Sequence, residues 1–164
     1  MLSRITEKIL SFVPEQHRNT AKQFIKFGIT GTIGAVVDFG TFGILTRGLN
    51  WTTTYNVLGT EVIAANNISV FLAICSNFII NRTWTFSSTE GSAAKQGMGY
   101  FILNIFTWTL NQIFVSLFFN WQLFVDLFGD QRDLMAKAAA IIITLFVNFF
   151  GSKLFVFRKT EGAK

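Results

Sequence analysis

The chain has 164 residues, of which 51% are hydrophobic, including 20 Phe, and only 14% are charged. A soluble domain of this size is far less apolar, so the composition indicates an integral membrane protein. The net charge of +5 does not indicate a nucleic-acid partner, because the Lys and Arg residues lie outside the apolar runs, as a topology signal would. We therefore expect no nucleic-acid binding.

The sequence has no residue pattern that predicts a metal site, a redox motif or a signal peptide. Cys75 is the only cysteine and lies inside an apolar run, which excludes an intrachain disulfide and a thiolate metal cluster. His17 is also alone and has no partner at metal-ligand spacing. No short apolar region with a cleavage site precedes the first long run, so we expect no removable signal peptide. We expect no metal site and no cofactor.

Residues 1–22 alternate apolar and charged positions and are interrupted by Pro14. This pattern fits a short helix lying in the membrane interface, and it fits a mobile basic tail equally well. We assign residues 1–22 to a cytoplasmic or interfacial segment, residues 23–158 to a membrane domain, and residues 159–164 to a cytoplasmic tail.

Four apolar runs predict an all-α membrane fold with four transmembrane helices. A helix of about 20 residues, at roughly 1.5 Å per residue, matches the hydrocarbon thickness of a bilayer. Polar connections separate the runs, and the one after the third run is acidic. The predicted spans cover residues 24–45, 62–80, 97–119 and 136–154.

The first predicted span contains one acid, and three of its glycines precede that acid in a regular row. Gly28, Gly31 and Gly34 are spaced by three residues, which allows a neighbouring helix to approach closely. Asp38 follows on the same side of the helix, and an acid inside a span is costly unless it faces a cavity or a partner. Asp38 is therefore a functional candidate, with a structural ion pair or hydrogen bond as the alternative.

Polar side chains also follow one face of the second and third spans. Asn66, Asn77 and Asn81 share a helical face, and amides that would be unsatisfied in lipid should turn inward. The third span places four further side chains near one face: Asn104, Thr107, Trp108 and Asn111.

The fourth span is short, because only 15 residues separate Lys137 from Lys153. At about 1.5 Å each, these residues cover roughly 22 Å, so at least one lysine lies within the membrane profile or snorkels to its edge. Lys137 shares a face with Thr144 and Asn148, which favours an inward role for it over simple snorkelling.

Residues 77–86 are repeated, with changes, at residues 148–157. Each copy has Asn then Phe in an apolar run, a basic residue five positions after the Asn, and aromatic residues two and four positions after the base. This is an internal repeat in which an amide lies at membrane depth and a cation marks the helix end. We expect the aromatic rings to lie at the height of the lipid headgroups.

The distribution of Lys and Arg predicts the orientation. Basic residues concentrate in the N-terminal segment, the central loop and the tail, whereas the other side carries only Arg47, Arg132 and Lys137, together with several acids. Both termini and the central loop should therefore be cytoplasmic. Two helical hairpins that each start and end inside make the repeat a parallel one.

The polar faces together predict a polar interior or groove that suits an anionic headgroup. Amide donors and cations are the groups that bind phosphate. Asp38 would accept hydrogen bonds from sugar hydroxyls or hold a lysine, and Lys137 would offer a cation toward the opposite side. An ordinary polar helix interface is the alternative. The cytoplasmic side would offer Asn77, Asn81, Arg82, Asn148 and Lys153, with Lys26 nearby.

The sequence resembles the GtrA-like family of small four-span membrane proteins over residues 24–158. The resemblance is carried by residues 24–31, 77–86, Lys137 and 148–157. The second repeat departs from the family pattern, since Ser152-Lys153 stands where an Asn-Arg pair would mirror the first.

The resemblance implies movement of a polyprenyl-phosphate-linked sugar, with undecaprenyl phosphate as the expected carrier, from the cytoplasmic to the outer leaflet of the inner membrane. Separate glycosyltransferases would make this lipid and use it in cell-surface polysaccharide or envelope glycosylation. Four short spans enclose little volume, so a homo-oligomer is expected.

No nucleophile and base pair and no Gly-rich phosphate loop is evident, so we expect no enzymatic activity. Two other functions stay open. One is a non-transporting anchor or accessory subunit of a polyprenyl-phosphate glycosyltransferase. The other is a small proton-coupled exporter that uses Asp38.

Overall fold

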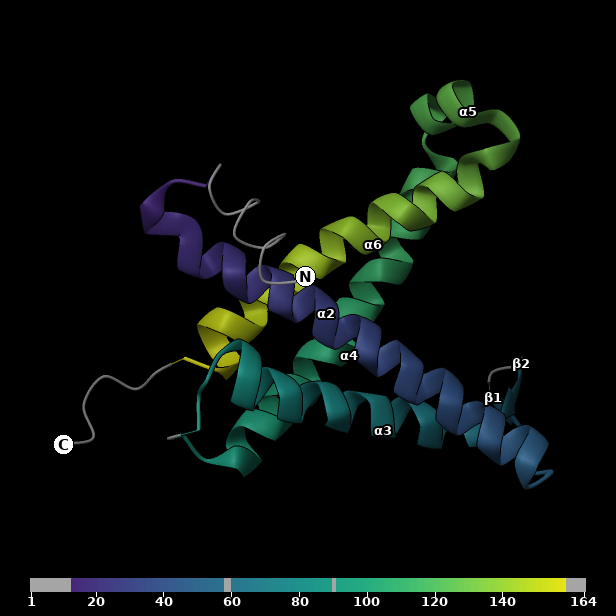
Figure 1. The fold of residues 1–164 in the computed structure, drawn as a ribbon. Coiled ribbons are helices and arrows are strands. Elements are labelled where there is room, and N and C mark those ends of the chain that lie inside the picture. The colour runs from purple at the N-terminus through teal and green to yellow at the C-terminus, as the bar shows by residue number, and fades with distance from the viewer. Residues whose placement is uncertain (1–12, 58–59, 90, 159–164) are drawn as a thin grey trace, which may run out of the picture. The chain divides into compact units, whose positions relative to one another are not determined.

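The computed structural model describes residues 13–57, 60–89 and 91–158. The chain forms two compact units, Met1–Ser87 and Ser88–Lys164, which we call the first and second hairpins (Figure 1). Four helical segments in the described residues are long and apolar enough to cross a membrane. The predicted all-α membrane fold with four spanning helices is therefore confirmed.

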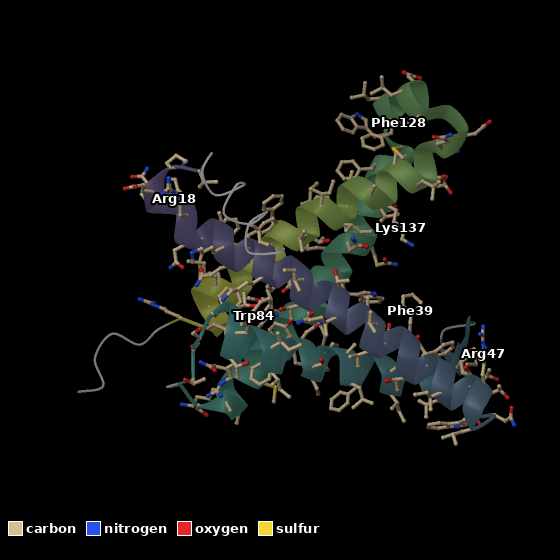
Figure 2. All side chains as sticks on the ribbon, in the orientation of Figure 1. Arg18, Phe39, Arg47, Trp84, Phe128 and Lys137 are labelled. Atoms are coloured by element: carbon tan, nitrogen blue, oxygen red, sulfur yellow. The ribbon has the colours of Figure 1, made fainter. Side chains whose placement is uncertain are left out.

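The first hairpin packs helix α2 against helix α3. At the end where the labelled Arg47 lies, two short strands pair antiparallel, with Thr54 opposite Ile63 (Figures 1 and 2). The sequence analysis did not predict these strands. In chain order the elements are α2 (Glu15–Gly43), the π-helix η1 (Ile44–Gly48), β1 (Thr54–Val57), β2 (Thr60–Ile63), α3 (Ala64–Ile80) and the π-helix η2 (Asn81–Thr85).

Helix α2 begins at Glu15, well before the predicted start of the first span. Pro14 precedes it with φ −52°, which suits a helix start because proline has no N–H to contribute to the helix. Residues 15–22, which were assigned to the N-terminal segment, are the first turns of this helix. The remainder of that segment, residues 1–12, and the tail at 159–164 lie outside the described residues.

The second hairpin packs helix α4 against helix α6. A short helix, α5, closes the end remote from η4 (Figure 1), and its rings stack on those of α4, with Phe118 and Phe124 at 5.0 Å between centroids. This cluster also includes Trp121 and Phe128. The elements are α4 (Ala93–Asn120), α5 (Gln122–Phe128), the 3-10 helix η3 (Gly129–Gln131), α6 (Arg132–Gly151) and the π-helix η4 (Ser152–Val156).

Small side chains form a regular part of the contact between the helices of each hairpin. Many large hydrophobic residues point outward, as Phe39 does with 77% of its surface exposed, which suits contact with lipid, whereas a few rings, such as Phe149, are buried. The buried residues recur at every fourth position and occupy corresponding places in the two repeats: Ala65, Ser69 and Ala73 on α3, and Ala136, Ala140 and Thr144 on α6.

Only one of the three predicted close-approach glycines lies against another helix. A Cβ built at Gly34 would overlap the Asn77 carboxamide, whereas Cβ atoms at Gly28 and Gly31 would meet nothing within 4 Å. Within the first hairpin, the close approach that the glycine spacing allows is therefore found at Gly34.

We predict that Gly34→Leu destabilises the first hairpin, whereas Gly31→Leu does not. The new side chain at position 34 must displace Asn77, and overpacking of this kind costs about 1–3 kcal/mol. The thermal unfolding midpoints of the two variants in detergent micelles provide the measurement. Equal midpoints for the two variants would contradict the assigned helix contact.

Candidate functional site

The two repeated sequences end in the same unusual backbone structure. Both α3 and α6 widen into π-helical turns, in which the Phe86 N–H donates to the Asn81 carbonyl at 2.9 Å and the Phe157 N–H donates to the Ser152 carbonyl at 2.8 Å. Such turns are rare and are frequent at functional sites. We call η2 the first basic turn, because it carries Arg82, and η4 the second basic turn, because it carries Lys153.

An aromatic pair holds each basic turn against the first long helix of its own hairpin. The rings of Phe27 and Phe86 lie 6.1 Å apart, and those of Tyr100 and Phe157 lie 5.8 Å apart. All four rings are buried. The aromatic residue four positions after each base therefore packs inside the hairpin. The aromatic residue two positions after each base is exposed, as is the labelled Trp84 (Figure 2).

The first basic turn has two further contacts with α2. The Lys26 ammonium donates a hydrogen bond to the Trp84 carbonyl at 3.0 Å and lies 5.0 Å from the centre of the Trp84 ring. One turn along the helix, the Thr30 and Thr85 hydroxyls are 3.3 Å apart, and both residues are buried. These contacts with α2 therefore fix the backbone position of the turn that carries Arg82.

Two amides lie at the start of this turn. Asn81 is fully buried, and Asn77 is half-buried over Gly34. The Asn77 side-chain oxygen is buried and accepts no hydrogen bond from the described residues. A buried acceptor without a donor costs about 1–3 kcal/mol, so its presence calls for a functional explanation.

Asp38 lies further along the contact between α2 and α3. It accepts a hydrogen bond from the Ser69 hydroxyl, and Ser69 is fully buried. The sequence analysis missed Ser69 as its partner. This contact agrees with the structural alternative for Asp38, while the half-buried carboxyl still reaches the hairpin surface.

The second hairpin has an uncharged polar contact between its helices, with a partner one turn further along the second helix. Asn111 follows Tyr100 by the same number of residues as Asp38 follows Phe27, and Tyr100 and Phe27 are the paired rings of their hairpins. Asn111 donates to the Thr144 hydroxyl at 3.3 Å, on α6. A carboxyl in one hairpin thus corresponds to an amide in the other.

The remaining candidates of the second hairpin fall into two places. Asn148 and Lys153 are half-buried near the second basic turn, where the Ser152 hydroxyl lies 3.5 Å from the Asn148 side-chain oxygen. Lys137 is exposed near the start of α6, away from that turn (Figure 2). Trp108, predicted near the polar face of the third span, is also exposed.

The structure therefore brings the predicted residues together in groups. Asn77, Asn81 and Arg82 gather at the first basic turn, and Asn148 and Lys153 gather at the second. Among the described residues, no group of three or more His, Cys, Asp or Glu side chains could hold a metal ion.

A chain of spanning helices in two repeated hairpins, each closed by a basic turn, is a small helical membrane protein with internal duplication. Residues 26–157 match the family model described as "GtrA/DPMS, transmembrane domain". The chain belongs to this family. Membership indicates a role connected with polyprenyl-phosphate sugars, and the family is generally non-catalytic.

One relative is the uncharacterized membrane protein YngA of Bacillus subtilis (strain 168). It is 25% identical to this chain over 142 residues, which covers 84% of each protein. No solved structure matches the chain.

We predict that Asn77→Leu leaves the protein as stable as the wild type or more stable by up to about 2 kcal/mol. The substitution removes the unsatisfied oxygen and keeps a similar volume. Thermal unfolding in detergent measures the effect. The matched control is Asn111→Leu, which loses the bond to Thr144 and should cost about 1 kcal/mol. A comparable loss in both variants would show that Asn77 has a structural partner.

Proposed function

We propose that this protein moves a polyprenyl-phosphate-linked sugar, with undecaprenyl phosphate as the favoured carrier, from the cytoplasmic to the outer leaflet. The observation that carries the proposal is a repeated arrangement, in which a cation lies on a π-helical turn and an amide lies five residues earlier on the same apolar helix. Family membership supports the substrate class. The lipid would serve cell-surface polysaccharide synthesis or envelope glycosylation.

The lipid phosphate would dock at the basic turns. Arg82 offers a planar fork of donors that fits phosphate oxygens, and Lys153 offers a point charge. Asn77 and Asn148 lie one turn earlier on the same helices and supply amide groups at greater depth. The polyprenyl tail would stay in lipid, against the apolar side chains that the helices expose.

The sugar would pass along the polar residues between the helix ends. Asp38 is half-buried and held by Ser69, so its second oxygen is suited to accept hydrogen bonds from sugar hydroxyls. Lys137 lies at the other end of its span from Lys153 and would receive the phosphate near the outer surface. Four spans alternate in direction, which would place both basic turns on one side of the membrane.

We assign the protein to the inner membrane, where separate glycosyltransferases would make and consume the lipid. A homo-oligomer would supply the enclosed volume that four spans lack.

A non-transporting anchor for a polyprenyl-phosphate glycosyltransferase is the second candidate. The hydrogen bond between Asp38 and Ser69 favours it, because the bond uses the polar residues to hold two helices together.

The first experiment measures leaflet-to-leaflet movement of an undecaprenyl-phosphate sugar in liposomes that contain only this protein. We expect movement in the wild type and at least a roughly tenfold loss in Arg82→Ala and Lys137→Ala, since each removes a charge worth about 1.4 kcal/mol or more to the bound phosphate. Lys22→Ala is the control, because it removes a charge from an exposed side chain of α2 that is not proposed to bind the lipid.

The outcomes separate the candidates. If the wild type moves no more lipid than empty liposomes do but still binds a partner synthase, the anchor function replaces transport. Proton flux that is stimulated by drugs and abolished in Asp38→Asn would instead support an exporter.

The orientation gives a second prediction. Reporter fusions after Lys164 should be active only in the cytoplasm, whereas a reporter inserted at Thr53 should be active only outside, because the basic residues hold the termini inside. A reporter that gives the opposite pattern would place the basic turns on the outer side and contradict the proposed direction of docking.

A further inference from the structure

Both basic turns lie where an anion is normally disfavoured. The last carbonyls of a helix lack partners within the helix, and together with the helix dipole they place roughly half a negative charge at the C-terminus. A phosphate that approaches Arg82 or Lys153 therefore meets a repulsive field as well as an attractive side chain. Some fixed positive charge is needed to offset that field.

The first hairpin has such a charge. The Lys26 ammonium bonds the Trp84 carbonyl at 3.0 Å, inside the last turn, and also lies over the Trp84 ring. The cation comes from α2, and the neighbouring ring pair of Phe27 and Phe86 fixes that helix against the turn. An ammonium has three donors, so two remain after the bond to the carbonyl.

The second hairpin has no side chain at the corresponding position. Lys26 precedes Phe27, and Gly99 precedes Tyr100, the ring that pairs with Phe157. A Cβ at Gly99 would lie 3.8 Å from a Val156 methyl group in η4, so this position faces the second basic turn. The contact is ordinary in length, which means that a larger residue fits at its Cβ.

We infer that Lys26 makes the first basic turn the stronger phosphate site, because it offsets the charge of the helix end and offers donors on the turn that carries Arg82. The second basic turn keeps Lys153 but is the weaker site. This inference rests on the proposed function, in which lipid phosphate docks at the basic turns. It names Lys26 as a phosphate-binding residue of the first basic turn and predicts that the two repeats bind phosphate with different strengths.

The test uses the full chain in nanodiscs of neutral lipid, with binding of undecaprenyl phosphate measured by native mass spectrometry. Lys26→Gln should weaken binding about three- to thirtyfold, the range expected when a charge at a helix end is lost. Lys26→Arg should restore it. Lys22→Gln makes the same charge change one turn earlier on α2, at an exposed side chain, and should leave binding unchanged.

A gain of binding provides the readout that a purely structural role would not give. Gly99→Lys should strengthen binding or add a second bound lipid, because it supplies the second basic turn with the missing cation. This arm stays informative if Lys26→Gln fails to fold, which thermal unfolding in the same nanodiscs would reveal.

The inference is overturned if Lys26→Gln folds and binds like the wild type while Arg82→Ala loses binding, or if Lys153→Ala loses more than Arg82→Ala. It is also overturned if Gly99→Lys folds and adds nothing. Absence of binding by the wild type would instead refute the proposed function. A competition experiment distinguishes a lipid phosphate from free phosphate as the ligand. Inorganic phosphate, added at the same concentration as undecaprenyl phosphate, should not displace the lipid, and displacement of half of it would identify free phosphate as the ligand.

Discussion

Close approach of the two long helices in each hairpin is the constraint on which the other contacts depend. Between helices in lipid there is little hydrophobic driving force, so small side chains that bring backbones together are the main source of contact energy. Buried Ala65 and Ser69 on α3 bring α2 close enough for short groups to meet. The Ser69 hydroxyl then reaches Asp38, and the Lys26 side chain reaches a carbonyl on the turn that follows α3.

Much of the architecture could be predicted from the sequence, because long apolar runs and a repeated motif are strong local signals. The basic residues of the repeat were correctly placed at helix ends. The part of the repeat upstream of Asn77 was missed, although small residues at every fourth position before Asn77 and Asn148 carry the same signal. That signal would have identified Ser69 as a buried contact residue.

Other features could not be predicted, since they depend on distant backbone groups. Lys26 bonds a backbone carbonyl, and because every residue has one, the sequence does not show which carbonyl is the partner. A π-helical turn likewise has no established sequence signature. The three-residue spacing allows close approach at Gly28, Gly31 or Gly34, but which of them meets α3 depends on how the two helices pack. Whether Asp38 is mainly a structural residue or a ligand likewise depends on contacts beyond its own helix.

The buried ring pairs have a consequence for biosynthesis. The pair of Phe27 and Phe86 closes the first hairpin entirely within residues 1–87, and the pair of Tyr100 and Phe157 closes the second within its own segment. Domains generally fold as units, with the N-terminal one first during synthesis. Each helical pair can therefore enter the membrane and pack as a unit. The first pair can do so while the ribosome is still translating the second.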